Sequence, residues 1–344
     1  MRIVVRGTNW VGDAIMSVPA LTELRRIFPG SHIALQTRAW AKDIFDELPI
    51  FDQIITLDRS GSVLKDALTL RKGNFDLAVV LPNSFSSALV PTLAGVRRRF
   101  GYSTDGRSLL LTDRCRVPDW KSERHEVNFY LNLVDELRKR FTDAAPTEAE
   151  LPEISLPVNN ERRSEAESRL ASLGIAKDAP TVMFAAGSTN SNAKRWGAES
   201  YAGLADRLAK DISAQILLLG APGEEPVAQK IIAMSQSRLT DLTGCTTLAE
   251  AAALIACADL FISNDMGLAH LAPAVGTPTL VIFGPTDHVT TRPFSSIAEV
   301  IRAGVDCSPC MLRECPIDHR CMTRVTVEQV FAAAAARLKG WAND

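Results

Sequence analysis

Neither sign of charge is in excess in this sequence of 344 residues, where 38 Lys and Arg residues stand against 40 Asp and Glu residues. A chain with so small a net charge has no overall field that would draw it onto nucleic acid or an anionic membrane. Any contact of that kind has to come from a local patch, and nucleic acid is not expected as a partner.

The sequence also contains no segment typical of an export signal or a membrane span. Met1 and Arg2 lead into a short apolar run at residues 3–5, without the longer apolar region and small-residue cleavage site of a signal peptide. The most apolar stretch, residues 251–262, is too short to cross a bilayer and contains Asp259. We therefore expect a cytoplasmic protein that contacts the cytoplasmic face of the inner membrane only peripherally.

The seven cysteines do not suggest the disulfide framework of a secreted protein, since their number is odd and no export signal precedes them. Four of them gather with one histidine in CSPCMLRECPIDHRCM, at Cys307, Cys310, Cys315, Cys321 and His319. The CxxC spacing leaves three alternatives open, namely a bound zinc ion, a reversible disulfide or reduced packed thiols. Because the spacings match no standard zinc finger, no metal site is predicted.

Two domains are expected from the length, at roughly 150 residues per domain. Short β-branched runs alternate with helical patterns in the first half, at RIVVRG, HIALQTR, DQIITLD and FDLAVVLP. The second half repeats the alternation at TVMFAAGS, QILLLGAPGE, DLFISND and TPTLVIFGP. Near-continuous apolar strands of this kind belong to parallel sheets covered by helices on both faces. The sequence thus predicts an α/β protein in which a Rossmann-like fold occurs twice.

A polar segment without periodicity, residues 143–162, is interrupted by three prolines and predicts the linker between the domains. We place the first domain at residues 1–158 and the second at residues 159–325. The last segment, residues 326–344, is rich in Ala and opens with Thr326, a favourable N-cap, so it predicts a closing helix.

Ligands bind at the carboxyl ends of strands in such folds, and the first of these turns lies in RGTNWVGDAIMSVPAL, residues 6–21. Asp13 would lie at the mouth of the first domain, where a helix begins. The alternative is that Asp13 is only the N-cap of that helix and that Gly7 and Gly12 serve the turn.

The second domain opens with AAGSTNSNAKRW, residues 185–196, whose small and hydroxyl residues suit a phosphate group. Backbone amides and the hydroxyls of Ser188 and Thr189 can donate to anionic oxygens, and Lys194 supplies a cation. The alternative is an ordinary polar surface loop. A Walker loop is excluded because GxxxxGK[ST] is absent.

The most informative stretch is SNDMGLAHLAPAVGTPTLVIFGPTD in the second half. Asp265 follows a predicted strand, and Met266, Gly267 and Leu268 would form the first turn of a helix whose amides and dipole favour a diphosphate. His270 still borders that turn. The alternatives are a plain N-cap role for Asp265 and a packed, hydrogen-bonded His270.

A further Gly-rich turn, GAPGEE at residues 220–225, ends in two carboxylates. An acid at this point of a Rossmann-like unit can bind ribose hydroxyls. Glu224 is the preferred candidate and Glu225 stays open, because either acid could instead complement a helix dipole.

These turns together resemble the heptosyltransferase family, glycosyltransferase family 9, whose members transfer heptose from ADP-heptose to the inner core of lipopolysaccharide. The resemblance covers nearly the whole chain and is carried by NWVGDAIMSVPAL, LPNSFSSALVPTLAGVRRRFGY, AKRW and NDMGLAHLAPAVGTPTLVIFGPT. The first two segments are most similar to the branch that adds the second heptose, onto heptosyl-Kdo2-lipid A. The resemblance implies the GT-B architecture, with two Rossmann-like domains around a cleft and a C-terminal helix that crosses back to the first domain.

The resemblance also implies roles for single residues. Asp13 matches the proposed catalytic base, Lys194 the lysine beside the donor diphosphate, and residues 265–268 with His270 the donor motif. The family usually has Thr or Ser where Met266 stands, so the contact of that hydroxyl with phosphate is lost here and the backbone amide remains.

The implied reaction is an inverting transfer without a metal ion or cofactor, in which protein groups offset the charge of the departing diphosphate. The implied acceptor carries carboxylates and phosphates, and the first domain holds it. Asn83, Arg97 and Arg98 are the acceptor-binding candidates, together with Arg99, and an ordinary solvated basic run is the alternative. The competing functions are transfer to another inner-core position, a nucleotide-sugar epimerase on the same scaffold and a two-lobed solute-binding protein.

Overall fold

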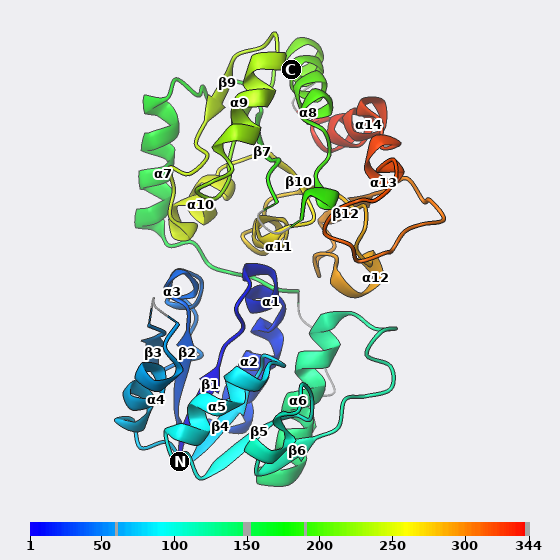
Figure 1. The fold of residues 1–344 in the computed structure, drawn as a ribbon. Helices are drawn as coiled ribbons and strands as arrows, with labels where there is room; N and C mark the ends of the chain where they lie inside the picture. Colours follow the sequence, from blue (N-terminus) through cyan, green and yellow to red (C-terminus); the bar gives the residue numbers. More distant parts are fainter. Residues whose placement is uncertain (59–60, 147–152, 189–190, 341–344) are drawn as a thin grey trace. The chain divides into compact units, whose positions relative to one another are not determined.

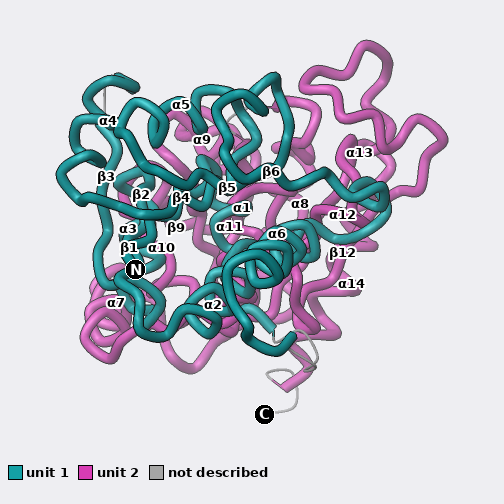
Figure 2. Tube along the Cα trace, turned by 90° about the horizontal axis from the view of Figure 1, so that it is seen from below, with its two compact units in different colours: residues 1–154 teal, residues 155–344 magenta. Residues whose placement is uncertain are grey.

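Two compact units make up the chain, Met1–Ile154 and Ser155–Asp344 (Figure 2). The division falls inside the predicted linker, and each unit holds one sheet of six parallel strands. The computed structural model describes residues 1–58, 61–146, 153–188 and 191–340. The two units are described one at a time.

The sheet of the first unit has the strand order β3-β2-β1-β4-β5-β6, as in a Rossmann-like fold (Figure 1). Its strands are β1 (Arg2–Arg6), β2 (His32–Thr37), β3 (Gln53–Thr56), β4 (Leu77–Val80), β5 (Arg98–Tyr102) and β6 (Asp113–Cys115). The helices are α1 (Val11–Met16), α2 (Val18–Ile27), α3 (Ala39–Phe45), α4 (Val63–Arg71), α5 (Phe85–Leu93) and α6 (Glu126–Phe141), with the 3-10 helix η1 (Arg107–Leu110).

Apolar runs explain why the centre of this sheet is buried on both faces. All four residues of β4 and the last four of β1 are buried. The parallel register aligns Arg6 of β1 with Val80 of β4, so both strands end at one edge. This carboxyl edge carries the loops that lead into α1 and α5, and Figure 1 places α1 and α3 at the end of the sheet away from the N-terminus.

The sheet of the second unit has the order β12-β11-β10-β7-β8-β9. Its strands are β7 (Thr181–Ala185), β8 (Gln215–Leu218), β9 (Leu239–Asp241), β10 (Leu260–Asn264), β11 (Thr279–Ile282) and β12 (Ala298–Ile301). The helices are α7 (Asn160–Ser172), α8 (Ala198–Ile212), α9 (Glu225–Met234), α10 (Leu248–Ile255), α11 (Gly267–Ala274), α12 (His288–Thr291), α13 (Arg320–Thr323) and α14 (Val327–Arg337), with the 3-10 helix η2 (Asn192–Lys194). No helix in the described parts of either unit is long and apolar enough to span a membrane.

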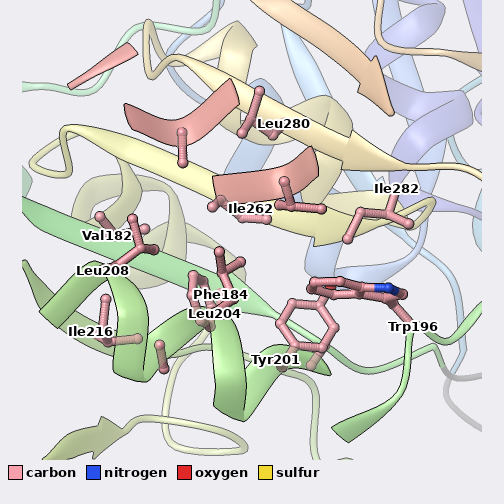
Figure 3. Packing of buried hydrophobic residues seen from close by; sticks show 14 of the residues in the cluster. Val182, Phe184, Trp196, Tyr201, Leu204, Leu208, Ile216, Ile262, Leu280 and Ile282 are labelled. Carbon is pink, nitrogen blue, oxygen red and sulfur yellow. The ribbon is translucent and has the colours of Figure 1, made fainter. Parts of the chain in front are cut away.

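The core of the second unit forms where α8 covers the central strands. Phe184 of β7 and Ile262 of β10 pack with Leu204 and Tyr201 of α8 (Figure 3). Trp196, 1% exposed, meets the Tyr201 ring edge to face with 5.0 Å between the ring centroids. Burial of such a ring removes about 150–250 Å² from water, at most roughly 4–6 kcal/mol of stabilisation. The packed Trp196 therefore anchors the segment between β7 and α8.

The closing helix begins as the sequence predicts. Thr326 is the N-cap of α14 and forms a capping box with Gln329. Val330, Ala334 and Leu338 are buried in the core of the second unit, where α14 packs against α8. A crossing of the C-terminal segment to the first domain stays a prediction.

Candidate functional site

Side chains from three strand ends of the second unit meet at Asp265. This residue follows β10 and is 6% exposed, and its Oδ2 accepts hydrogen bonds from Lys194 Nζ at 2.7 Å and from Thr286 Oγ1 at 2.7 Å. Lys194 belongs to the turn after β7, and Thr286 follows β11. The Lys194 side chain keeps 27% exposure. A cation is thus held in place at the carboxyl edge of this sheet while its side chain stays partly exposed.

Helix α11 starts two residues after Asp265. Met266 is its N-cap, with extended backbone (φ −151°) and no capping hydrogen bond from the side chain, so the alternative of a plain N-cap role for Asp265 is excluded. Gly267 and Leu268 are half-buried, and His270 in the same turn is buried. The first amides of a helix carry its positive dipole end, so the α11 start adds to the field of the lysine.

Asn264 binds both ends of the connection between β7 and α8, as well as α8 itself, and was not singled out from the sequence. Its Oδ1 accepts from Trp196 N at 3.0 Å and from Tyr201 Oη at 3.2 Å. Its Nδ2 donates to the carbonyls of Ala186 at 2.7 Å and Gly187 at 3.3 Å. The side chain is fully buried. The end of β10 therefore fixes the loop after β7 and the turn that carries the lysine.

The loop after β7 contains Ser188, which is buried and whose carbonyl accepts from Arg195 Nη2 at 3.0 Å. Its neighbour Thr189, a predicted donor-binding residue, lies outside the described residues. At Ser188 the loop is thus bonded to the turn that carries Lys194 and Arg195.

Of the two acids after β8, Glu224 contacts this loop. It is 4% exposed, its Oε2 accepts from Ala221 N at 2.9 Å, and a Cβ added to Gly187 would lie 2.1 Å from its Cδ. Glu225 begins α9 and accepts from Gly223 N at 2.7 Å. Contact with the loop after β7 is thus observed for Glu224, and the role of that acid as a ribose ligand stays a prediction.

The cysteine-containing segment, residues 307–322, contacts both turns that flank Asp265. On one side, Ala193 N and Ser191 Oγ donate to Arg313 O at 3.0 and 3.1 Å. His319 Nε2 lies 2.6 Å from Ala193 O. On the other side, Pro285 O accepts from the amides of residues 310 and 311 at 3.0 and 2.8 Å. This segment therefore positions the backbone next to Lys194 and next to Thr286.

The cysteines of that segment are free thiols. Cys321 is 7% exposed, and burial together with the nearby thiols Cys307, Cys315 and Cys310 raises its pKa. In the described ranges, which include the whole segment, no three His, Cys, Asp or Glu side chains form a group that could hold a metal ion. The choice among the three alternatives left open by the sequence stays a prediction.

Asp13 lies in the first turn of α1, at the carboxyl edge of the first unit. The helix begins at Val11 with Trp10 as N-cap, so the alternative that Asp13 is only the N-cap is excluded. Tyr130 of α6 donates its hydroxyl to Asp13 Oδ1 at 3.2 Å. Burial and the charge of Asp13 raise the pKa of Tyr130 far above its usual value, so the phenol stays protonated. The half-buried carboxylate of Asp13 thus accepts a hydrogen bond from a phenol that stays protonated.

The predicted acceptor residues lie at opposite edges of this sheet. Asn83 follows β4 at the carboxyl edge, is exposed and accepts from Thr104 Oγ1 at 2.8 Å through its carbonyl. Arg98 begins β5 and aligns with Leu77, the first residue of β4, so Arg97 and Arg98 lie at the amino edge.

The arginines at the amino edge have local partners. Arg98 pairs with Asp113 at 3.1 Å and lies 3.9 Å over the Phe141 ring. Arg99 donates to the carbonyls of Leu110 and Val96, both at 2.6 Å. The structure therefore does not bring these arginines together with the carboxylate in α1.

A buried arginine that the sequence did not single out holds the loop of Asn83. Arg107 is fully buried, donates to Tyr102 O at 2.8 Å and to Ser87 Oγ at 3.0 Å, and also contacts Pro82 O. An isolated basic residue in a polar turn gives no sequence signal for such a role.

Comparison with known proteins identifies the family. The sequence model of glycosyltransferase family 9 (heptosyltransferase) matches residues 63–320. Lipopolysaccharide heptosyltransferase 2 of Escherichia coli K12 is 31% identical over 315 residues, covering 88% of each chain. Lipooligosaccharide heptosyltransferase 2 of Haemophilus influenzae is 30% identical over 318 residues, again with 88% of each chain covered.

Solved structures agree. The structure of E. coli ADP-heptose LPS heptosyltransferase II superposes with a TM-score of 0.83 at 30% identity, covering 99% of each chain. A family 9 glycosyl transferase from Veillonella parvula, 22% identical, shares the fold with a TM-score of 0.82 over 98% of this chain and 97% of that one. With GT-B architecture and this similarity over most of its length, the chain belongs to glycosyltransferase family 9, the heptosyltransferases.

Proposed function

We propose that this glycosyltransferase transfers L-glycero-D-manno-heptose from ADP-heptose to heptosyl-Kdo2-lipid A, adding the second heptose of the lipopolysaccharide inner core. The observation that carries the donor part is the Lys194 ammonium group, fixed by a buried carboxylate beside the start of α11. The 31% identity with heptosyltransferase 2 of E. coli over 88% of the chain supports the choice of sugar and acceptor.

The second unit binds the donor in this proposal. Lys194, the amides at Gly267 and Leu268 and the loop at Ser188 receive the diphosphate, and the carboxylate of Glu224 accepts ribose hydroxyls. Charge accumulates on the diphosphate as the bond to the anomeric carbon breaks. A preorganised cation and helix amides stabilise that charge more in the transition state than in the bound donor.

The first unit binds the acceptor and supplies the base. Asp13 removes the proton of the attacking hydroxyl while the oxygen bonds to the anomeric carbon and ADP leaves from the opposite face, which inverts the configuration. The Tyr130 hydroxyl donates to Asp13 Oδ1 at 3.2 Å and so holds the carboxylate in place. Because the acceptor is a membrane glycolipid, the proposal includes peripheral contact with the cytoplasmic face of the inner membrane.

The test compares acceptors side by side. Purified protein is incubated with ADP-heptose and either Kdo2-lipid A or its mono-heptosylated form, and the glycolipid products are measured by mass spectrometry. We expect strong preference for the mono-heptosylated acceptor, because a site built to hydrogen-bond a sugar rejects an acceptor without it. Equal or faster transfer to Kdo2-lipid A would refute the acceptor assignment, and absence of transfer to both would refute heptosyl transfer to this core.

A further inference from the structure

Three neighbouring elements of the first unit, α4, α5 and η1, expose apolar side chains. Among the described residues of this unit, five of the seven exposed large hydrophobic side chains lie on these elements, with exposed fractions from 43% to 87%. We call them the apolar face, which consists of Leu64 and Leu68 of α4, Phe85 and Leu93 of α5, and Leu109 of η1. Single apolar residues are common on protein surfaces, but a group of this kind marks an interaction site.

Helical spacing and packing bring these side chains together. Leu64 and Leu68 lie one turn apart on α4, and the partly exposed Leu89 stands at the same interval between Phe85 and Leu93 on α5. Helix α5 packs against both α4 and η1, and Figure 2 shows α4 and α5 as neighbours on the same side of the strands. The apolar face is therefore one surface that extends across three adjacent elements.

The same part of the chain is basic, although the whole chain is not. Residues 61–110 contain seven Lys and Arg residues against three Asp residues, a surplus of four positive charges, while the whole chain has a net charge of −2. All three acids accept hydrogen bonds from backbone amides, at 2.6–2.8 Å. Arg71, Lys72 and Arg97 are exposed, and none of them forms an ion pair with a described acid. Uncompensated cations thus accompany the apolar face.

The opposite face of the same sheet is different. It is covered by α2 and α6 (Figure 2), which expose no large hydrophobic side chain anywhere in their described lengths. All five cations of these two helices form ion pairs, such as Arg26 with Glu23 at 2.6 Å and Lys139 with Asp135 at 2.8 Å. The combination of apolar exposure and unpaired positive charge therefore distinguishes the apolar face from the face behind it.

This combination is complementary to an anionic lipid bilayer. The cytoplasmic leaflet has a negative surface potential that attracts Lys and Arg, and apolar side chains enter the boundary between its headgroups and acyl chains. A second copy of the chain fits the same surface poorly, because symmetric contact would bring the two sets of cations together. Charge therefore favours lipid over a second copy as the occupant.

The apolar face also adjoins the edge at which the acceptor is proposed to bind. Phe85 opens α5 just after the loop that contains Asn83, and Leu64 lies in the first turn of α4, which follows β3. Both therefore lie toward the carboxyl edge of the sheet, the edge that carries α1 with Asp13.

We propose that the apolar face, with Arg71, Lys72 and Arg97, docks the first unit on the anionic lipid surface in which the acceptor glycolipid is embedded. The glycan then reaches the carboxyl edge of the sheet while its acyl chains stay in the bilayer. This inference rests on the proposed function for the nature of the acceptor, and it names the surface through which the peripheral membrane contact is made.

The first experiment measures co-sedimentation of the full chain with vesicles of phosphatidylethanolamine and phosphatidylglycerol, and with neutral vesicles of phosphatidylcholine. The apolar variant combines Phe85→Ser with Leu93→Ser. Its control combines Ile232→Ser with Met234→Ser, which removes two exposed apolar side chains from the end of α9 in the second unit. We expect the apolar variant to lower binding to the anionic vesicles at least tenfold and the control to leave it unchanged.

A second pair of variants tests the charges. Arg71→Gln with Lys72→Gln is compared with Lys210→Gln and Lys230→Gln, a matched loss of two exposed cations in the second unit. The first pair should weaken binding to the anionic vesicles severalfold, and added salt should do the same to the wild type, because ions screen surface charges. The control pair should bind as the wild type does. Neutral vesicles should bind the wild type only weakly.

Heptosyl transfer provides a readout that a merely structural role would not give. The acceptor is presented either in the anionic vesicles or as the same glycan freed of its acyl chains. The apolar variant should raise the KM for the acceptor in vesicles at least tenfold and leave transfer to the acyl-free glycan, and the Tm of the protein, unchanged. Equal losses with both acceptors, together with a lower Tm, would show damage to the fold and overturn the proposal.

Two further outcomes would overturn it. One is vesicle binding by the apolar variant equal to that of the wild type. The other is a wild-type dimer that the apolar variant dissociates in analytical ultracentrifugation, which would make this face a contact between two copies of the chain. Vesicle binding that depends on the apolar face, without heptosyl transfer to either form of the acceptor, would instead overturn the proposed function and leave the docking surface standing.

Discussion

Replacement of Asn264 by Asp changes one atom at the point where the end of β10 binds the connection between β7 and α8. The carboxylate still accepts from Trp196 N and Tyr201 Oη, as the amide oxygen does at 3.0 and 3.2 Å. The amide nitrogen, which donates to Ala186 O at 2.7 Å and Gly187 O at 3.3 Å, becomes an oxygen that faces two carbonyl oxygens. The orientation of the amide is assigned from this network, because only one orientation matches each donor with an acceptor.

The expected loss of stability follows from those contacts. Each buried carbonyl left without its donor costs about 1–3 kcal/mol. Because the Gly187 contact is long, we expect a total of roughly 3 kcal/mol for Asn264→Asp. A carboxyl group buried against two carbonyls has its pKa raised above the unfolded value of about 3.9, since ionisation is disfavoured there. The unfolded state then loses its proton first, so the variant loses stability as pH rises above about 4.

Urea denaturation of the full chain at several pH values between 4 and 7 measures this effect, with Trp fluorescence as the signal. Asn160→Asp is the control, because Asn160 is exposed at the first position of α7 and should change stability little. The donor KM should rise in Asn264→Asp, since the loop after β7 and the lysine turn lose their shared anchor. An unfolding free energy within about 1 kcal/mol of the wild type at pH 7, or no pH dependence relative to it, would refute the reasoning.

Two further predictions concern the reaction. Asp13→Asn should lower kcat by about 10²- to 10⁴-fold, the usual contribution of a general base, while ADP binding measured by calorimetry stays intact; near-normal turnover would limit Asp13 to a structural role. Lys194→Ala should remove roughly 2–4 kcal/mol of transition-state stabilisation, which steady-state assays measure as a fall in kcat/KM. An unchanged kcat/KM would show that this lysine does not act on the leaving group.

The fold could be predicted because the central strands are apolar runs. All eight runs found in the sequence are strands of the structure, whereas β5, β6, β9 and β12 were not recognised. These four strands, such as RRFGY and DRC, are short or polar and form the outer parts of each sheet. The position of the acceptor arginines was missed for this reason, and their role in acceptor binding stays a prediction. Without β5, nothing in the sequence indicates that Arg97 and Arg98 stand at the start of a strand and so lie at the amino edge.

The sequence predicted those donor-site residues that stand in the turns after strands. Asp265 and Lys194 are of this kind, and the structure joins them at 2.7 Å. Asn264 and Thr286 act instead through hydrogen bonds between loops that are far apart in the sequence. Neither composition nor periodicity carries information about such partners. Both residues stand within the motif that was recognised. The sequence therefore identified the segment, but it did not show that these two residues bind the neighbouring loops.

For the cysteine-containing segment, the sequence drew attention to side chains, whereas the structure shows contacts made by the backbone. Its thiols and its histidine suggested metal or redox chemistry, yet its contacts with the donor site are made mainly by backbone groups and by His319. An irregular segment can reach two turns at once because its amides and carbonyls are not used within a helix or sheet. Residues 307–322 thus hold Lys194 and Thr286 on either side of Asp265 without contacting that carboxylate themselves. A change of thiol chemistry there would reach the leaving-group cation only through the position of these two turns.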